Sequence, residues 1–238
     1  TQVLKDAVIQ SAKILEVDSN TDEIKSLIDS AMQAGVERNL GHDYLQDIEQ
    51  RYEESARVTS PTPWDIMNEL MQGGLGGGEL GVVVAPAGIG KSWVLSAMGA
   101  YALSQGLNVV HYTLELNEAY VGLRYDSIFS GVESQNLKYH KEEVMEKLFN
   151  LKGNLTIKYY PTKSCTVNTL SAHLKKVVTF GDKVDMVLVD YADIMRDVHK
   201  SSEMRHALGN IYEDLRGLAG ELQVPIWTAS QANRSALD

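Results

Sequence analysis

Apolar residues in most of this chain fall into short runs that alternate with stretches of helical spacing. The runs are rich in Val, Ile, Thr and Tyr, and they predict strands over residues 79–84, 107–114, 155–160, 186–190 and 225–230. Between them, apolar residues recur every three or four positions, which predicts helices from Trp93 onward and over residues 118–131, 139–149, 167–180 and 202–222. This alternation is typical of a mainly parallel sheet with helices on both faces, so we expect an α/β domain.

Residues 1–60 show helical spacing without a strand signal. Helices are expected over residues 1–16, 20–35 and 44–57. The last of them is the most polar, and Leu45, Ile48 and Tyr52 form one narrow apolar stripe among its charges. Such a stripe needs a surface to pack against.

The boundary of the α/β domain is expected near residue 60. Pro61, Pro63 and the glycine-rich stretch at 73–78 separate the helices from the first strand. We therefore expect a helical arm or linker over residues 1–60 and a second domain over residues 61–238. Two interpretations of the arm are open: it docks on a neighbouring subunit, or it forms a small helical subdomain around its own core.

Composition narrows the class of protein. Hydrophobic residues make up 44% of the 238 positions, and no apolar run approaches the roughly 18 residues of a membrane span. The segment from Thr1 is polar and amphipathic rather than a signal sequence, so a cytoplasmic location without a membrane partner is expected. The single cysteine, Cys165, excludes an internal disulfide, and the histidines lack metal-ligand spacing. A formal net charge of -10 restricts any nucleic-acid contact to a local basic patch.

One short segment carries the chemistry around which the chain is organised. It reads Ala85, Pro86, Ala87, Gly88, Ile89, Gly90, Lys91 and Ser92. The segment fits the phosphate-binding loop pattern except that alanine replaces the first glycine, and it lies between an expected strand and an expected helix. In such a loop, backbone N–H groups bind phosphate oxygens, Lys91 lies against the β and γ phosphates, and Ser92 ligates Mg²⁺. We therefore predict a nucleotide site.

Polar residues at three further strand ends are expected near that loop, because parallel α/β sheets bind ligands at the carboxyl ends of their strands. Asp190 ends an apolar run and is suited to hold the Mg²⁺ shell opposite Lys91. Glu115 is a candidate to polarise a water for in-line attack on the γ-phosphate, the alternative being an exposed strand-end glutamate. Gln231 offers an amide that can hydrogen-bond the γ-phosphate or the attacking water and so report hydrolysis.

Four short segments of the sequence carry a resemblance to a known protein family, through their residues, their order and their spacing. They are the phosphate loop at 85–92, Thr113-Leu114-Glu115-Leu116, Val189-Asp190-Tyr191 through Met195, and Val224 through Ser230-Gln231-Ala232-Asn233-Arg234-Ser235. Together they resemble the RecA-like motor domain of DnaB-type replicative helicases, particularly those of tailed phages. The stretch from Pro61 to Leu80 is similar as well, so the resemblance covers roughly residues 60–238. It implies a RecA-like P-loop NTPase fold with a mainly parallel central sheet, preceded by a helical arm.

The resemblance implies a helicase that hydrolyses ATP with Mg²⁺ at subunit interfaces, moves along single-stranded DNA and unwinds duplex. It implies that Glu115 is the catalytic base, that Asp190 is the Mg²⁺-associated carboxylate and that Gln231 is the γ-phosphate sensor beside Lys91. Candidate phosphate contacts to DNA are Arg196, Lys200 and Arg205. A solvated loop is the alternative for these residues. Two more arginines match the family and receive no role: Arg124 and Arg234.

Partners follow from the same resemblance. In this family a linker helix docks on the adjacent subunit and closes a six-membered ring, so we expect a homohexamer on single-stranded DNA, with primase and a helicase loader as partners. Family members continue past the Asn-Arg-Ser motif to a basic finger that reaches the neighbouring ATP site, whereas this sequence stops at Asp238. Because such a finger contributes about 10³ to 10⁵ in turnover, we expect a truncated motor domain that binds nucleotide and hydrolyses it poorly.

Two other functions fit parts of the same pattern. A RecA- or RadA-type strand-exchange ATPase shares the phosphate loop and Glu115, although Asp190-Tyr191 followed by Ser-Gln-x-Asn-Arg favours the helicase. A nucleotide-binding assembly or loader protein without turnover shares the loop alone. A closed ring rather than a filament excludes the first alternative, and hydrolysis stimulated by single-stranded DNA excludes the second.

Overall fold

The computed structural model describes residues 9, 11–12, 24, 43–54, 58–199, 201 and 203–232, and the structural statements below concern these residues. The chain divides into two compact units, Thr1–Ala56 and Arg57–Asp238. The helices predicted over residues 1–16 and 20–35 lie outside the described residues apart from isolated positions.

The first unit contains the helix α3 (Ile48–Glu54), which begins four residues after the start of the predicted segment 44–57; positions 55–57 lie outside the described residues. The reason is a local turn, because a carboxylate oxygen of Asp43 accepts hydrogen bonds from the backbone N–H groups of Leu45 and Gln46, both at 3.0 Å. The helix therefore begins after this turn. Leu45 and the other stripe residues of the segment are exposed.

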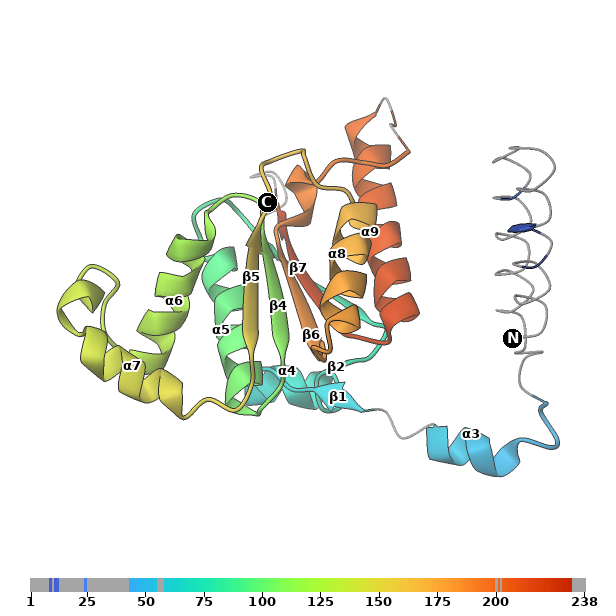
Figure 1. The fold of residues 1–238 in the computed structure, drawn as a ribbon, viewed down its shortest axis with the longest axis horizontal. Coiled ribbons are helices and arrows are strands. Elements are labelled where there is room, and N and C mark those ends of the chain that lie inside the picture. Colours follow the sequence, from blue (N-terminus) through green and yellow to red (C-terminus); the bar gives the residue numbers. More distant parts are fainter. Residues whose placement is uncertain are drawn as a thin grey trace. The chain divides into compact units, whose positions relative to one another are not determined.

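A parallel sheet forms the centre of the second unit (Figure 1). In chain order its strands are β3 (Leu80–Ala85), β4 (Val109–Thr113), β5 (Leu155–Tyr159), β6 (Met186–Asp190) and β7 (Ile226–Gln231). In space the order is β3-β7-β6-β4-β5, and all neighbouring pairs run parallel. The predicted α/β class with a mainly parallel sheet is confirmed.

Helices cover both faces of this sheet (Figure 1). They are α5 (Lys91–Ser104) and α6 (Glu118–Ser130) on one face, and α8 (Val167–Thr179) and α9 (Met204–Leu222) on the other. Strand β6 shows how the sequence produces two cores: Val187 and Val189 pack toward α8 and α9, while Met186 and Leu188 pack toward α5 and α6. All four side chains are buried, as expected of a strand covered on both faces.

Five smaller elements were not predicted as the structure has them. The helix expected over residues 139–149 is divided into a 3-10 turn, η1 (Leu137–Tyr139), and α7 (Lys141–Phe149). Before the sheet, β1 (Thr59–Ser60) and β2 (Leu75–Gly76) form an antiparallel ribbon around α4 (Asp65–Leu70). None of the helices in the described part of the chain is long and apolar enough to cross a membrane.

His111 on β4 makes the stability of the fold depend on pH. The side chain is fully buried, and its Nδ1 lies 2.9 Å from the hydroxyl of Tyr125. Burial lowers the pKa of His111 to about 3, and the Arg124 guanidinium acts in the same direction. The ordinary pKa of a histidine is 6.5. Between the lowered and the ordinary pKa, the unfolded chain therefore carries a proton on His111 that the folded chain does not carry.

We therefore expect the free energy of unfolding to fall by about 2 kcal/mol from pH 7 to pH 5 through this residue. The measurement is urea unfolding at both pH values for the parent and His111→Gln, which should lose most of the difference. His140→Gln is the control, because it removes an exposed imidazole in place of the buried one. A pH dependence that persists in His111→Gln would show that other groups cause it.

Candidate functional site

The phosphate loop connects β3 to α5 at the carboxyl end of the sheet. Gly90 precedes the first helical residue with φ of 104°, and Gly88 has φ of 78°. A Cβ atom at either position would meet nothing within 4 Å, so the backbone conformation rather than crowding requires glycine there. The helix α5 begins at Lys91, two residues before the predicted start. Its N-terminus therefore follows the loop directly, as anion binding requires.

Lys91 and Ser92 lie at the start of α5. The Lys91 ammonium donates hydrogen bonds to the carbonyl oxygens of Ala85 and Pro86, both at 3.0 Å. The Ser92 hydroxyl donates to a carboxylate oxygen of Asp190, also at 3.0 Å, although the two residues are 98 positions apart. Burial raises the pKa of the Asp190 carboxyl, and the Ser92 hydrogen bond partly opposes this rise. The two oxygen donors expected to hold Mg²⁺ are thus adjacent.

The strand order places Gln231 and Glu115 on either side of Asp190. Strand β7 lies between β3 and β6, so Gln231 at its end stands between the phosphate loop and Asp190. Strand β4 lies on the other side of β6, and the backbone N–H of Leu114 donates to the carbonyl of Asp190 at 2.9 Å. The Thr113 hydroxyl accepts from the N–H of Leu116 at 3.2 Å and fixes the turn that carries Glu115.

These strand ends enclose a cavity of about 330 Å³. The predicted site residues that line it are Ala87, Gly88, Gly90, Lys91, Ser92, Glu115 and Gln231. Pockets for small ligands are typically about 300–1,000 Å³, so the volume lies at the lower end of that range. Ile89 points outward with 70% of its surface exposed.

Arg124 on α6 also lines this cavity, together with Trp93. One guanidinium nitrogen lies 4.0 Å from a carboxylate oxygen of Asp190, and the guanidinium carbon lies 5.4 Å from the centre of the Trp93 ring. That nitrogen is buried without a hydrogen-bond partner among the described residues. Sequence reasoning named Arg124 without a role and missed Trp93, whose position two residues after Lys91 was the available signal.

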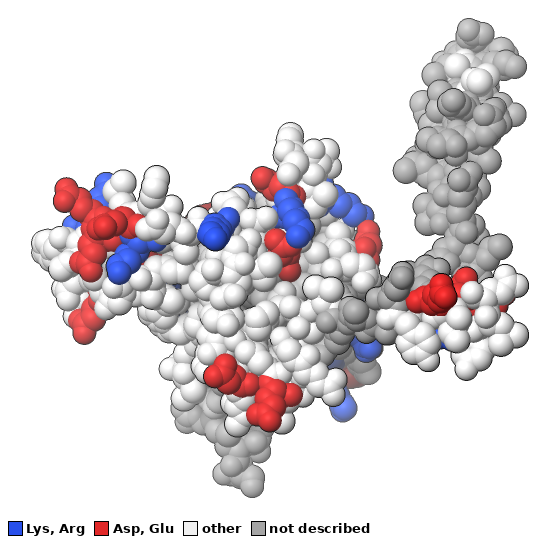
Figure 2. All heavy atoms as spheres, turned by 90° about the horizontal axis from the view of Figure 1, so that it is seen from below, with Lys and Arg blue, Asp and Glu red and all other residues white. Residues whose placement is uncertain are grey.

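Arg196 and Arg205, two of the candidate DNA contacts, do not line the cavity of about 330 Å³ beside the phosphate loop, which we call the phosphate cavity. Arg196 is exposed, and its backbone N–H donates to the carbonyl of Cys165 at 2.8 Å. It lines a second cavity of about 720 Å³ with Lys163. Arg205 is exposed in the first turn of α9, and Lys200 and Arg234 lie outside the described residues. Figure 2 shows basic and acidic side chains interspersed on the face of the molecule that is opposite the carboxyl ends of the strands.

The loop between β3 and α5, with polar residues at the ends of β4, β6 and β7 around it, defines a P-loop NTPase fold of the RecA-like class. The chain belongs to the DnaB-like helicase family, because the family model described as the DnaB-like helicase C terminal domain matches residues 61–237.

Relatives and solved structures agree with this family. The DnaB-like replicative helicase of Enterobacteria phage T4 is 27% identical, and the match covers 96% of this chain and 54% of the relative. The replicative DNA helicase DnaB of Geobacillus stearothermophilus is 26% identical, and the match covers 96% of this chain and 55% of the relative. The chain therefore spans about half the length of these curated relatives.

Two solved structures show the same fold. One is a DnaB-like replicative helicase described with its interactions with primase, with a TM-score of 0.69 at 14% identity, covering 99% of this chain and 57% of that one. The other is described as an ATPase domain and has a TM-score of 0.64 at 15% identity, covering 88% of this chain and 72% of that one.

Proposed function

We propose that this chain is the ATP-hydrolysing motor part of a replicative DNA helicase that moves along single-stranded DNA and unwinds duplex. The observation that carries the proposal is the arrangement of Lys91, Ser92, Glu115 and Gln231 around one cavity. Behind it, the Ser92 hydroxyl is bonded to the buried Asp190. Family membership over residues 61–237 supports it. The domain limits proposed from the sequence, 1–60 for the arm and 61–238 for the motor, are kept in this proposal.

In this proposal the chain's own residues bind and orient the triphosphate. The backbone N–H groups of the loop and the Lys91 ammonium bind the phosphates. Ser92 and Asp190 supply the hydroxyl and carboxylate oxygens that Mg²⁺ prefers, and the bound ion would neutralise charge on the β and γ oxygens. Glu115 takes the proton of the attacking water, and the Gln231 amide hydrogen-bonds the γ-phosphate or that water.

The proposed assembly is a homohexameric ring with single-stranded DNA at its centre, in the cytoplasm of a bacterium or a phage-infected host. The exposed stripe residues Leu45, Ile48 and Tyr52 are proposed to dock on the adjacent subunit. Primase is a proposed partner because a structural neighbour is described with it, and a helicase loader is a further proposed partner. Arg196, Lys200 and Arg205 remain candidates for phosphate contacts.

The experiment that tests this function measures ATP hydrolysis by the full-length protein with and without single-stranded DNA, alongside native mass spectrometry. The expected result is a six-membered assembly whose ATPase rate rises on addition of single-stranded DNA. An open filament would favour a RecA- or RadA-type ATPase instead. Nucleotide binding with no DNA-stimulated hydrolysis would favour an assembly or loader protein.

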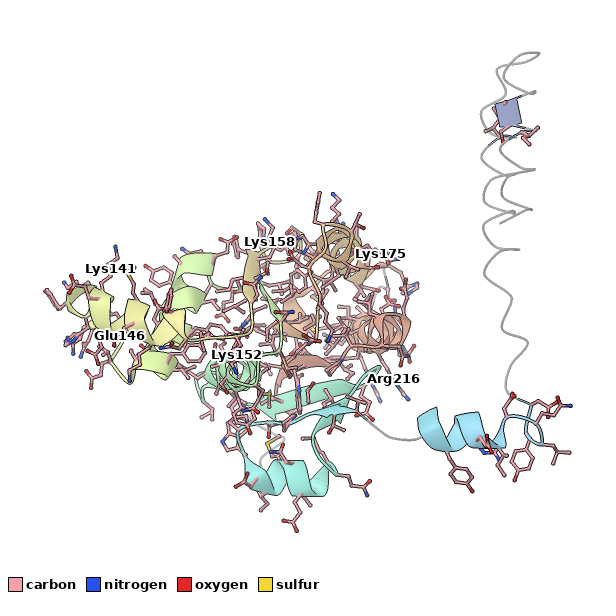
Figure 3. The ribbon with its side chains drawn as sticks, turned by 60° about the horizontal axis from the view of Figure 1, so that its bottom comes forward. Lys141, Glu146, Lys152, Lys158, Lys175 and Arg216 are labelled. Carbon is pink, nitrogen blue, oxygen red and sulfur yellow. The ribbon has the colours of Figure 1, made fainter. Side chains whose placement is uncertain are left out.

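Arg196→Ala tests the DNA-facing segment. If Arg196 contacts a phosphate, its removal should weaken binding uniformly across DNA sequences, because phosphate contacts carry no sequence information. The slope of log affinity against log salt should become shallower by about 0.7 for each phosphate of single-stranded DNA that the protein no longer neutralises. Fluorescence anisotropy over a salt series measures both quantities. Arg216→Ala is the matched control, since Arg216 is exposed on α9 (Figure 3) and does not line the cavity that Arg196 lines. An equal change in that variant would contradict the assignment.

A further inference from the structure

Asp193 connects three parts of the domain through hydrogen bonds. It lies in the 3-10 turn η2 (Ala192–Ile194), three residues after Asp190. One of its carboxylate oxygens accepts from the Tyr212 hydroxyl at 2.5 Å. The other accepts from the Ser230 hydroxyl at 3.2 Å and from the backbone N–H of Gln231 at 2.7 Å. The turn after β6, the helix α9 and the end of β7 are therefore joined at one side chain.

The contact to Gln231 is made by the backbone, which leaves the amide side chain for the phosphate cavity that it lines. The next residue is tied to the phosphate loop, because the backbone N–H of Ala232 donates to the carbonyl of Ala85 at 3.2 Å. Backbone hydrogen bonds thus hold Gln231 in place on two sides: Asp193 bonds Gln231 itself, and the start of the phosphate loop bonds the next residue. A shift of either neighbour moves the amide relative to the cavity.

The segment after η2 is held to α9 by a second carboxylate. Asp197 accepts hydrogen bonds from the backbone N–H groups of His199 and Ser201, both at 2.9 Å. The Asn210 amide of α9 lies 3.4 and 3.3 Å from its two oxygens. Arg196 lies between the two anchored positions, so α9 and the candidate DNA-facing segment are linked at Asp193 and at Asp197. Of these two carboxylates, Asp193 is the one that also contacts β7.

From this arrangement we infer that Asp193 is a positioning residue that couples the γ-phosphate sensor Gln231 to the candidate DNA-facing segment around Arg196. This inference rests on the proposed function. A carboxylate suits the role because both of its oxygens accept, whereas all three of its neighbours donate. Burial and the hydrogen bond to Asp193 raise the pKa of Tyr212, which keeps that hydroxyl protonated as a donor. Loss of the γ-phosphate contact at Gln231 would then be transmitted to the segment through one rigid connection.

Asp193→Asn tests this coupling with minimal change of shape. An asparagine offers one acceptor oxygen in place of two. When that oxygen accepts from the Gln231 N–H, the NH₂ group faces the Tyr212 hydroxyl, so the charge-assisted hydrogen bond to α9 is lost. Asp197→Asn is the matched control, because it removes the same charge from the same segment without touching β7. The readout is the affinity of the full-length protein for a labelled single-stranded oligonucleotide, with a non-hydrolysable ATP analogue and with ADP.

The ratio of these two affinities measures the coupling, which between two sites is typically about 5–150-fold. We expect Asp193→Asn to reduce this ratio at least about fivefold while Asp197→Asn retains it. By thermodynamic reciprocity, the effect of DNA on the affinity for the ATP analogue must fall by the same factor. A general loss of stability would instead weaken DNA binding with both nucleotides and leave the ratio unchanged.

The outcomes separate this inference from the proposed function. If nucleotide does not change the DNA affinity of the parent protein, the proposed function fails and the inference with it. If the parent responds and Asp193→Asn responds equally, or if Asp197→Asn loses the response to the same extent, the inference alone is overturned. Should Asp193→Asn fail to fold, Tyr212→Phe removes the hydrogen bond between Asp193 and α9. If the ratio of the DNA affinities with the ATP analogue and with ADP were unchanged in Tyr212→Phe, the inference would also be overturned.

Discussion

Replacing Lys91 with alanine is expected to abolish nucleotide binding. The Lys91 ammonium donates to the carbonyl oxygens of Ala85 and Pro86, the first two residues of the phosphate loop. Its positive charge therefore lies beside the loop, where the β and γ phosphates would bind. A hydrogen bond to a charged group contributes about 1.5–3 kcal/mol, and two such contacts to phosphate oxygens make an affinity loss of about 100-fold or more the expected result. Titration with a fluorescent ATP analogue measures this loss directly.

The control for this variant is Lys141→Ala, which removes a lysine of the same charge from the first turn of α7, outside the cavity (Figure 3). It should bind the analogue as the parent does. Because Lys91 also bonds two loop carbonyls, thermal unfolding should accompany the titration, so that a folded Lys91→Ala protein is compared. Unchanged ATP affinity in that folded variant would refute the assignment of the phosphate loop.

Replacing Glu115 with glutamine is expected to separate binding from hydrolysis. The substitution keeps the shape of the side chain and removes the basic carboxylate, so the contacts of Lys91 and Ser92 with the nucleotide should persist. General-base catalysis typically contributes about 10²–10⁴-fold, and we expect the hydrolysis rate to fall at least about tenfold while ATP affinity stays nearly intact. Phosphate release in the presence of single-stranded DNA measures the rate.

Glu146→Gln on α7 is the matched control, because Glu146 lies outside the cavity and its loss removes the same charge (Figure 3). It should leave hydrolysis and binding unchanged. If Glu115→Gln lost affinity and hydrolysis together, Glu115 would have a structural role in the turn after β4. If it retained full hydrolysis, another group would be the base.

The pattern of apolar residues along the chain was sufficient to predict the strands of the central sheet. Each strand of the central sheet was predicted from an apolar run, with ends within two residues of the observed ones for β3 to β7. The phosphate loop followed from its glycines and Lys91, because the chemistry of that loop is written in consecutive residues. The antiparallel ribbon of β1 and β2 was missed, since each strand has two residues and its pairing joins Thr59 to Gly76 across α4.

Arrangement in space required the tertiary structure. Alternating strands and helices indicate a parallel sheet but leave the strand order open, and it is the order that places β7 between β3 and β6 and so brings Gln231 beside the loop. The contact of Ser92 with Asp190, the position of Arg124 beside Trp93, and the three hydrogen bonds of Asp193 depend on the same order.

The sequence by itself therefore determined the strands of the central sheet, the residues near which they end and the candidate residues for phosphate chemistry. Only the tertiary structure decided which strand ends are neighbours and which side chains meet there. The physical reason is that periodicity and loop chemistry act over a few residues, whereas strand order depends on packing both faces of the sheet against helices distant in the chain.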